Sequence, residues 1–300
     1  ILIRITVCNR GKEASPVHLL PTLWLRNTWS RTDRVLKPSL RAGEGGKHSA
    51  IHAHHSEPLP QESLQDYTLV CDGNPELLFT ENETNSERLF RQPNPSPYVK
   101  DGINNHVVNG QSGAVNTEQT GTKASAHYVL NVAANGAAVI KLRLIATPPK
   151  EVQDPFGKQF DEVFAARLSE ADQFYRGIVP VSVSRDEANV MRQALAGMLW
   201  TKQYYGFDAG RWLEEHQAHP LRGHSRVIRN REWFHMVNDH IISMPDKWEY
   251  PWYAAWDLAF HSIALSSVDL DFAKDQLDLM LREIYLHPNG QIPAYEWNFS

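Results

Sequence analysis

The sequence predicts a multidomain protein of mixed β and α class, with a β-rich first half and a helical second half. Short apolar runs separated by Gly, Pro, Asn and Ser fill residues 1–148, which is typical of an antiparallel β-sandwich. A diproline segment at 147–149 ends this pattern, and apolar residues then recur at helical spacing. We therefore expect a β-sandwich domain over 1–148, a helical linker over 149–180 and the start of an all-α domain over 181–300.

The expected strands are short and alternate apolar with polar residues. Alternation is clearest at 1–7 and 140–144, where every second residue is Ile, Leu or Val. Four further apolar runs that we expect to contain strands are 17–27, 67–71, 77–80 and 127–132. Segment 41–61 is rich in Gly, Pro and His, and 92–105 contains three prolines, so we expect long loops there.

Four amphipathic patterns predict helices beyond the diproline. The first repeats an apolar residue at every fourth position over 156–168, and Ser184 with Glu187 forms a capping box that opens the second. The third, over 252–263, has apolar residues on several faces, so we expect it to be buried among other helices. The fourth covers 272–284. No strand pattern is recognised in this half.

Composition narrows the class of protein. The 300 residues include 30 Lys and Arg, 35 Asp and Glu and 42% hydrophobic residues, which is typical of a folded globular chain. A formal charge of −5 without a long basic run argues against nucleic acid as the main partner. No apolar stretch reaches the roughly 18 residues of a transmembrane helix, and Cys8 and Cys71 alone cannot form a disulfide framework.

Both ends of the sequence have the character of interior segments. Ile1 already belongs to an alternating strand pattern, and residues 289–299 are rich in aromatic side chains without a polar tail. We expect the chain to be an internal piece of a longer protein. A polypeptide shortened only for expression is the alternative.

Tryptophan and carboxylates are concentrated together in the second half. Seven of the nine tryptophans lie at or beyond residue 200, and carboxylates adjoin them at 248–249, 256–257 and 296–297. Aromatic faces bind the apolar faces of sugar rings, while carboxylates bind hydroxyls and transfer protons. Apolar packing beside a carboxyl favours its protonated form, which a general acid requires. The alternative is an ordinary helical core with capped or solvated acids.

Segment 244–261 is the most informative one. Pro251 is suited to the first position of a helix, which would place Asp257 about a turn and a half into it, with aromatic neighbours. A buried acid in such a place requires a partner or a function. An ion pair with Lys247 or His261 is the structural alternative.

This segment resembles the tryptophan–aspartate helix of glycoside hydrolase family 63 in its bacterial branch, which includes mannosylglycerate and glucosylglycerate hydrolases. Four other segments resemble parts of the same proteins: 21–30 (PTLWLRNTWS), 98–104 (YVKDGIN), 121–124 (GTKA) and 288–297 (PNGQIPAYEW). The resemblance covers most of the chain and is weakest over about 31–61.

The resemblance implies a fold and a mechanism. It implies an N-terminal β-sandwich followed by an (α/α)6 toroid, of which 181–300 would be the first part, and hydrolysis with inversion at the anomeric carbon. Asp257 matches the general acid, and the aromatic walls of the sugar site match Trp252 and Trp256. The residues expected to line the pocket further along are Tyr295, Glu296 and Trp297. The family analogy, with two cysteines, also suggests a cytoplasmic location.

The expected general base is absent from this stretch. In the family it is a glutamate on a later helix, and twelve helices of ordinary length need several hundred residues. Glu249 and Glu296 are the only stand-ins in the sequence, and neither matches the base position. We therefore expect the chain to contain the acid half of an inverting α-glycoside hydrolase acting on a small α-glucoside or α-mannoside. The alternatives are a carbohydrate-binding protein without catalysis and an inactive partial gene product.

We expect no metal and no other cofactor. The one histidine cluster, at 48–55, lacks cysteine and well-spaced carboxylates apart from Glu57. No phosphate-binding glycine loop, nucleophile elbow or zinc-protease helix is present. The expected partner is a small carbohydrate, and the oligomeric state does not follow from the sequence.

Overall fold

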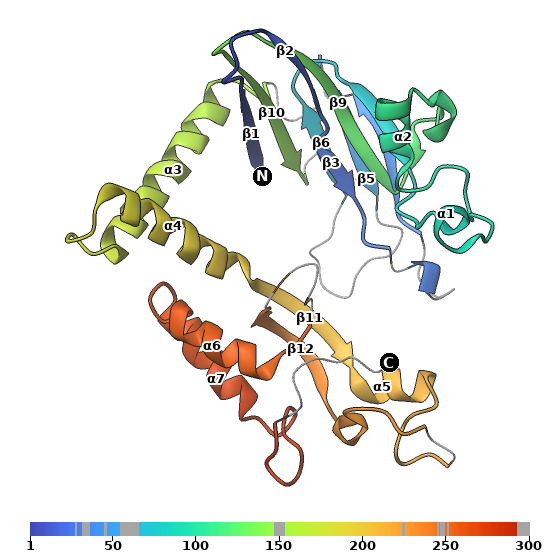
Figure 1. Ribbon diagram of the computed structural model, residues 1–300, viewed down its shortest axis with the longest axis vertical. Coiled ribbons are helices and arrows are strands. Elements are labelled where there is room, and N and C mark those ends of the chain that lie inside the picture. The colour runs from blue at the N-terminus through green and yellow to red at the C-terminus, as the bar shows by residue number, and fades with distance from the viewer. Residues whose placement is uncertain are drawn as a thin grey trace. The chain divides into compact units, whose positions relative to one another are not determined.

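The computed structural model describes residues 1–27, 29–31, 37–44, 47–54, 66–146, 154–223, 226–244, 246, 250 and 252–292. The chain divides into two compact units, Ile1–Arg167 and Leu168–Ser300, and the division lies within the expected linker 149–180. The class is mixed β and α, as predicted, with antiparallel sheets and seven α-helices among the described residues (Figure 1). No described helix has the length and apolarity needed to cross a membrane.

A six-stranded antiparallel sheet forms one part of the first unit. Its strands in spatial order are β1 (Leu2–Cys8), β10 (Ala137–Ile145), β6 (Tyr67–Cys71), β5 (Ser49–His54), β4 (Ser39–Glu44) and β8 (Thr120–Gly121). The alternating residues of β1 and β10 face each other in register, with Ile5 opposite Ile140. The strands predicted from alternation at both places are therefore confirmed.

The second sheet of this unit is built around the long strand β9 (Lys123–Val132). Its partners are β2 (Ser15–Leu19), β3 (Thr22–Trp24) and β7 (Glu76–Thr80). The short helix α2 (Gly102–Asn109) packs on it, because Ile103 joins Leu78 and Val115 in a small apolar cluster. A further short helix, α1 (Ser86–Phe90), follows β7 in the sequence (Figure 1).

One hydrophobic core is shared by the two sheets. Leu40, Ile51 and Leu142 from the six-stranded sheet are fully or almost fully buried, and they belong to the same cluster as Phe79 and Ala124 from the other. Burial of apolar surface of this kind is the main favourable contribution to the folding free energy. The inward-facing residues of both sheets therefore stabilise the unit together.

The expectation of a loop over 41–61 is wrong for its first part, because β4 and β5 form a hairpin there. The inward positions Leu40, Ile51 and Ala53 are buried, while His52 and His54 lie at less buried positions of β5. Glycine and histidine at these positions conceal the alternation in the sequence. Residues 55–61 lie outside the described residues. The loop expected over 92–105 is also interrupted, because α2 begins at Gly102.

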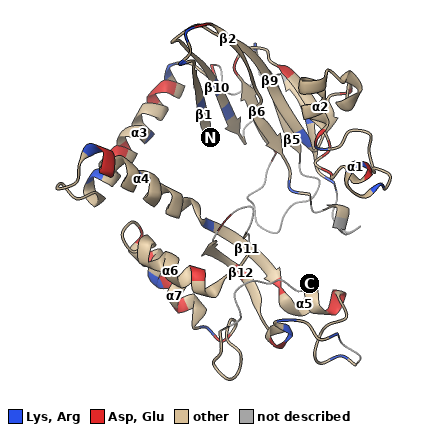
Figure 2. Ribbon diagram, viewed as in Figure 1, with Lys and Arg blue, Asp and Glu red and all other residues tan. Residues whose placement is uncertain are grey.

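The long helix α3 (Lys158–Ile178) crosses the division between the units, and α4 (Arg185–Trp200) follows it. Acidic and basic residues are interspersed along α3 (Figure 2). The predicted capping box of α4 is confirmed, because the Ser184 hydroxyl accepts from the Glu187 N–H and the Glu187 carboxylate accepts from the Ser184 N–H. This arrangement satisfies two helix-end donors at once.

The second unit is not all helical, so that part of the prediction is wrong. Strands β11 (Lys202–Asp208) and β12 (Val237–Ser243) pair antiparallel over their full length. Tyr205 and Phe207 pack against the core of this unit, but Tyr204, the residue before them, is 65% exposed although it is also aromatic. Such apolar residues at outward positions obscure the two-residue period. The helix α5 (Ala209–Glu215) follows β11 directly.

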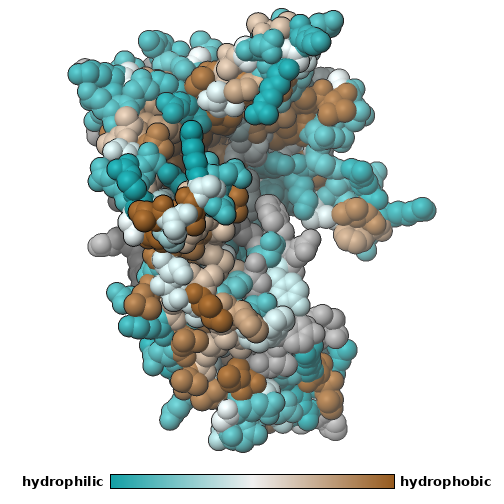
Figure 3. Space-filling view, turned by 60° about the vertical axis from the view of Figure 1, so that its left-hand side comes forward, coloured by the Kyte–Doolittle hydropathy of each residue, from teal (hydrophilic) through white to brown (hydrophobic). Residues whose placement is uncertain are grey.

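The helices α6 (Ala255–Leu265) and α7 (Leu270–Met280) complete the described part of the second unit. Only one side of α6 is covered, through residues such as Leu258 and Leu265. Trp256, Phe260 and Ile263 are 55%, 64% and 69% exposed, so the expectation that this helix is buried on several faces is wrong for the described residues. Figure 3 shows apolar side chains at the surface of the helical part of the chain.

Candidate functional site

Asp257 lies in the first turn of α6, closer to the helix start than the sequence predicts. The helix begins at Ala255, after the extended residue Ala254, and Pro251 lies outside the described residues. Asp257 is therefore the third helical residue. Ala254, which precedes the helix, makes no side-chain cap hydrogen bond, and the first turn of a helix has N–H groups without intrahelical partners.

The carboxyl of Asp257 contains a buried oxygen without a partner. In the part of the chain that the structure describes, Oδ2 is buried and has no hydrogen-bond partner, although the residue as a whole is partly exposed. The same holds for Nε1 of the half-buried Trp252 and for the hydroxyl of Tyr253. A buried polar atom without a partner costs about 1–3 kcal/mol. Three such atoms within six residues indicate a place where a bound polar molecule or water would supply the missing partners.

Several aromatic residues lie close to Asp257 in the sequence and contact other aromatic rings. The exposed ring of Trp256 meets Phe260 edge to face, with centroids 6.2 Å apart, and Trp252 lies against Tyr250 with centroids 4.8 Å apart. Tyr253 stacks at an angle on Tyr285, centroids 5.1 Å apart, and burial raises its pKa above the usual value. An acid with an unpaired oxygen, one residue from the exposed Trp256, is suited to binding a sugar and to proton transfer.

A chain of buried and half-buried polar side chains connects this region with the β-hairpin. His261, one turn after Asp257, contacts the Ser243 hydroxyl through Nδ1 at 2.7 Å, and Ser243 contacts the Thr201 hydroxyl at 2.7 Å. Burial lowers the pKa of His261, and the charge of Asp257 raises it in part. The structure gives no ion pair between Asp257 and His261, and Lys247, the other expected partner, lies outside the described residues.

Four other residues predicted for the site or for its missing base lie outside the described residues. These are Glu249, Tyr295, Glu296 and Trp297. The structure therefore places Trp256 and Asp257 in the first turn of α6 and Trp252 three residues before this helix, and the remaining pocket residues stay predictions. Sequence reasoning did not identify Ser243 and Thr201, and the only available signal was the four-residue spacing of Asp257 and His261 on one helix face.

In the first unit, three of the segments that carry the family resemblance converge. The main chain of Leu25 donates to the Thr122 carbonyl at 3.0 Å, and the Lys123 ammonium donates to the Lys100 carbonyl at 2.7 Å. Segments 21–30, 98–104 and 121–124 thus meet at one place, although about 100 residues separate the first from the last. A side chain at Gly121 would collide with the main-chain oxygen of residue 80, which explains the glycine there.

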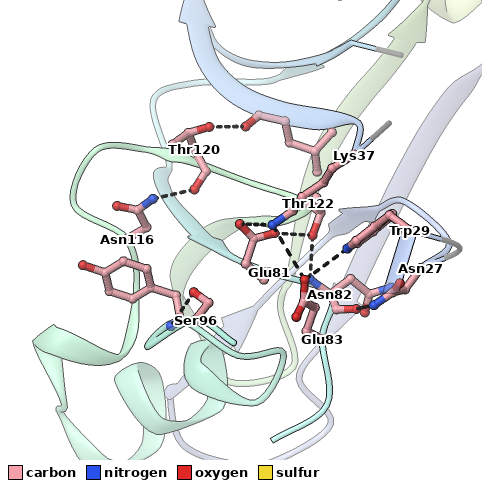
Figure 4. Close-up of polar contacts among 12 residues, drawn as sticks. Asn27, Trp29, Lys37, Glu81, Asn82, Glu83, Ser96, Asn116, Thr120 and Thr122 are labelled. Atoms are coloured by element: carbon pink, nitrogen blue, oxygen red, sulfur yellow. Dashed lines mark hydrogen bonds and ion pairs between the residues drawn. The ribbon is translucent and has the colours of Figure 1, made fainter. Parts of the chain in front are cut away.

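Two largely buried carboxylates hold these segments together through hydrogen bonds and an ion pair (Figure 4). Glu81 accepts from the Thr122 hydroxyl at 2.7 Å and pairs with Lys37 at 2.9 Å, so both of its oxygens are engaged. Glu83 accepts from the Trp29 indole at 3.0 Å. Their side chains are 18% and 11% exposed. Because these acids are already paired, the arrangement indicates a structural role, in contrast to the unpaired oxygen of Asp257.

The described histidines of the cluster at 48–55 each have separate contacts. His52 contacts Thr68 and His54 contacts Asp66, both at 2.8 Å, while His48 accepts from the Gly73 N–H. In the parts of the chain that the structure describes, no group of three or more His, Cys, Asp or Glu side chains is arranged to hold a metal ion.

Comparison with known proteins gives one informative similarity. No family model matches the chain. The chain is 38% identical over 325 aligned residues to a Saccharomyces cerevisiae protein described as "Uncharacterized protein YMR196W". The alignment covers 99% of this chain but 30% of that relative, so the chain spans about a third of the length of the relative it matches.

Proposed function

We propose that this chain forms the N-terminal sandwich and the first helices of an inverting α-glycoside hydrolase of the family 63 type. Asp257 is its general acid, and Trp252 and Trp256 are walls of the sugar site, with Tyr295, Glu296 and Trp297 lining the pocket further along. The substrate is a small α-glucoside or α-mannoside, such as a sugar joined to glycerate. The observation that carries the proposal is the buried Oδ2 of Asp257, which has no hydrogen-bond partner among the described residues and belongs to the helix turn that carries Trp256.

The architecture is consistent with this assignment. Two antiparallel sheets that contribute to one core support a β-sandwich, and helices α6 and α7 with exposed apolar faces support a toroid whose other helices are supplied by further chain. The greater length of the yeast relative also supports a longer protein. In such a protein the general base lies on a later helix, and water attacks from the side opposite Asp257.

In the proposed reaction Asp257 donates its proton to the glycosidic oxygen as the bond to the anomeric carbon breaks. The base removes a proton from the attacking water, and the new hydroxyl is attached with inverted configuration. The 300-residue chain contains the acid and lacks this base, so the proposal assigns turnover to the full-length polypeptide.

The test compares full-length wild type, Asp257→Asn and Asp271→Asn on a panel of α-glucosides and α-mannosides. Asp271 is an exposed acid in the first turn of α7 and serves as the matched control. We expect Asp257→Asn to lower kcat by 10²-fold or more while sugar affinity is retained, and Asp271→Asn to keep normal turnover. Binding without turnover by the wild type would favour a carbohydrate-binding protein, and normal turnover by Asp257→Asn would refute the assignment.

A further inference from the structure

A polar cleft of about 410 Å³ lies in the first unit and is lined by residues in and beside the helices α1 and α2. Four of its side chains are carboxamides, and two others are charged with opposite sign. They are Asn85, Asn94, Asn105, Gln111, Glu87 and Arg88. None of the described residues that line this amide cleft is aromatic. Its surface is therefore rich in groups that both donate and accept hydrogen bonds.

One wall of the amide cleft is held by hydrogen bonds between side chains. The Asn85 amide donates to both carboxylate oxygens of Asp101 at 3.2 and 3.1 Å, and Arg88 donates to the same carboxylate at 3.2 Å. The Asn94 amide donates to the Asn85 side-chain oxygen at 3.2 Å, and the Asn94 oxygen accepts from the Glu87 N–H at 3.1 Å. These groups are oriented before a ligand arrives, which lowers the ordering cost of binding.

The other wall is held through the main chain. The Gln111 N–H donates to the Asn105 carbonyl at 3.3 Å, and the Ala114 N–H donates to the Gln111 carbonyl at 3.0 Å. The helix α2, which carries Asn105, is anchored to the sheet because Ile103 and Leu78 belong to one buried apolar cluster. Both walls are thus formed in advance, as is usual for small-molecule sites.

Several hydrogen-bonding groups of the amide cleft remain available to a ligand. Among the described residues, no partner is bonded to the Asn105 side-chain nitrogen, the Gln111 carboxamide or the Glu87 carboxylate. Arg88 uses part of its guanidinium on Asp101, and its other N–H donors stay free. The cleft therefore offers amide, guanidinium and carboxylate groups to a ligand that carries several donors and acceptors of its own.

These groups favour a neutral ligand that is rich in hydroxyls. A hydroxyl donates one hydrogen bond and accepts others, and a carboxamide is complementary to it because it also does both. Glu87 and Arg88 carry opposite charges, so the lining favours neither an anion nor a cation. A nucleobase would find no aromatic ring to stack on among the described lining residues. The cleft volume is within the range of small-molecule pockets, roughly 300–1,000 Å³.

We propose that the amide cleft is a second carbohydrate site, which binds a neutral hexose unit through the available groups of both walls. Asn105 and Gln111 exchange hydrogen bonds with the sugar hydroxyls. Glu87 accepts from these hydroxyls, and Arg88 donates to them. The inference goes beyond the proposed function, because sugar binding in this cleft requires neither Asp257 nor turnover.

The first test is hydrogen exchange by mass spectrometry on the 300-residue chain, with methyl α-glucoside and methyl α-mannoside as probes. We expect at least one glycoside to slow exchange in peptides covering 85–114, because a ligand that binds the folded form opposes its local opening. Sodium phosphate and adenosine represent the disfavoured ligand classes. Protection of 85–114 by phosphate or adenosine without protection by either glycoside would overturn the proposal, and so would the absence of protection by any probe.

The second test compares Asn105→Ala with Asn104→Ala. Asn104 is an exposed residue of the same helix outside the cleft lining, so it is the matched control. We expect the dissociation constant of the bound glycoside to rise roughly threefold to tenfold in Asn105→Ala, because one hydrogen bond to the ligand is lost, and to change less than about twofold in Asn104→Ala. Equal dissociation constants in the two variants would contradict the assignment.

The third test fills the cleft with a larger side chain. A Cβ atom added at Gly113, which lines the cleft, would have no neighbour within 4 Å, and the same is true of Gly197 in α4. Gly113→Leu should abolish the protection of 85–114 by the glycoside, and the control Gly197→Leu should retain it. Undiminished protection in Gly113→Leu would overturn the proposal. If Gly113→Leu does not fold, the comparison of Asn105→Ala with Asn104→Ala decides the outcome.

Failure of this site and failure of the proposed function are distinguishable. Protection at 85–114 without hydrolysis by the full-length polypeptide would refute the proposed function and leave the second site intact. Hydrolysis that requires Asp257, without protection at 85–114, would refute the second site and leave the proposed function intact.

Discussion

Replacing Thr122 by valine tests whether the polar network in the first unit holds its segments together. Thr122 is 1% exposed, and its hydroxyl accepts from the Asn82 N–H and donates to the Glu81 carboxylate, both at 2.7 Å. Valine has nearly the same shape but makes neither bond. A neutral hydrogen bond contributes about 1 kcal/mol and one to a charged group about 1.5–3 kcal/mol, so we expect a loss of about 2.5–4 kcal/mol.

The assay is hydrogen exchange by mass spectrometry during urea denaturation, because it reports the first unit separately from the second. Peptides covering β7 and β9 should become unprotected at lower urea in Thr122→Val than in the wild type. The matched control is Thr6→Val, an exposed threonine of β1, which should change the free energy of unfolding by less than about 0.5 kcal/mol. A Thr122→Val protein as stable as this control would refute the structural role of the network.

Three further outcomes are expected. Hydrogen bonds from Lys202 and from the Phe272 main-chain N–H hold the pKa of Asp269 below its usual value. The ionised Asp269 therefore stabilises the fold at neutral pH, and this contribution is lost as the pH falls below about 4. The difference in urea midpoint between wild type and Asp269→Ala should shrink between pH 7 and pH 3. Burial raises the pKa of the Cys71 thiol to about 12, while Cys8 is exposed, so a disulfide reagent at pH 8 should titrate one thiol per native chain and two after denaturation. Removal of the α4 cap by Ser184→Ala should cost about 1 kcal/mol, measured as faster hydrogen exchange in that helix.

The sequence predicts an element correctly where the local pattern and the tertiary environment agree. The strand at 67–71 is β6 with the same bounds, because its apolar residues are bounded by turn signals. The α4 cap was predictable because Ser184 and Glu187 satisfy donors of their own helix, a purely local requirement. By contrast, β11 and β12 depend on each other for pairing, and the exposed Tyr204 and Ile241 are as apolar as the residues that face the core.

The candidate site also depends on features that the local sequence pattern does not encode. A first-turn or second-turn position for Asp257 depends on where the helix begins, and Pro251 suggested a start four residues before the observed one. The hydrogen-bonded surroundings of His261 depend on Ser243 and Thr201, which are 18 and 60 residues distant in the sequence and become neighbours through the hairpin. No periodicity within one segment encodes such a contact.

In the proposed function, Asp257 protonates the leaving group of an α-glycoside. The most direct test is ¹H NMR of the full-length polypeptide with a small α-glucoside or α-mannoside, recorded before the released sugar mutarotates. We expect the β-anomer to be released first, and Asp257→Asn to lower its rate of formation by 10²-fold or more. Release of the α-anomer, or an unchanged rate in Asp257→Asn, would contradict it.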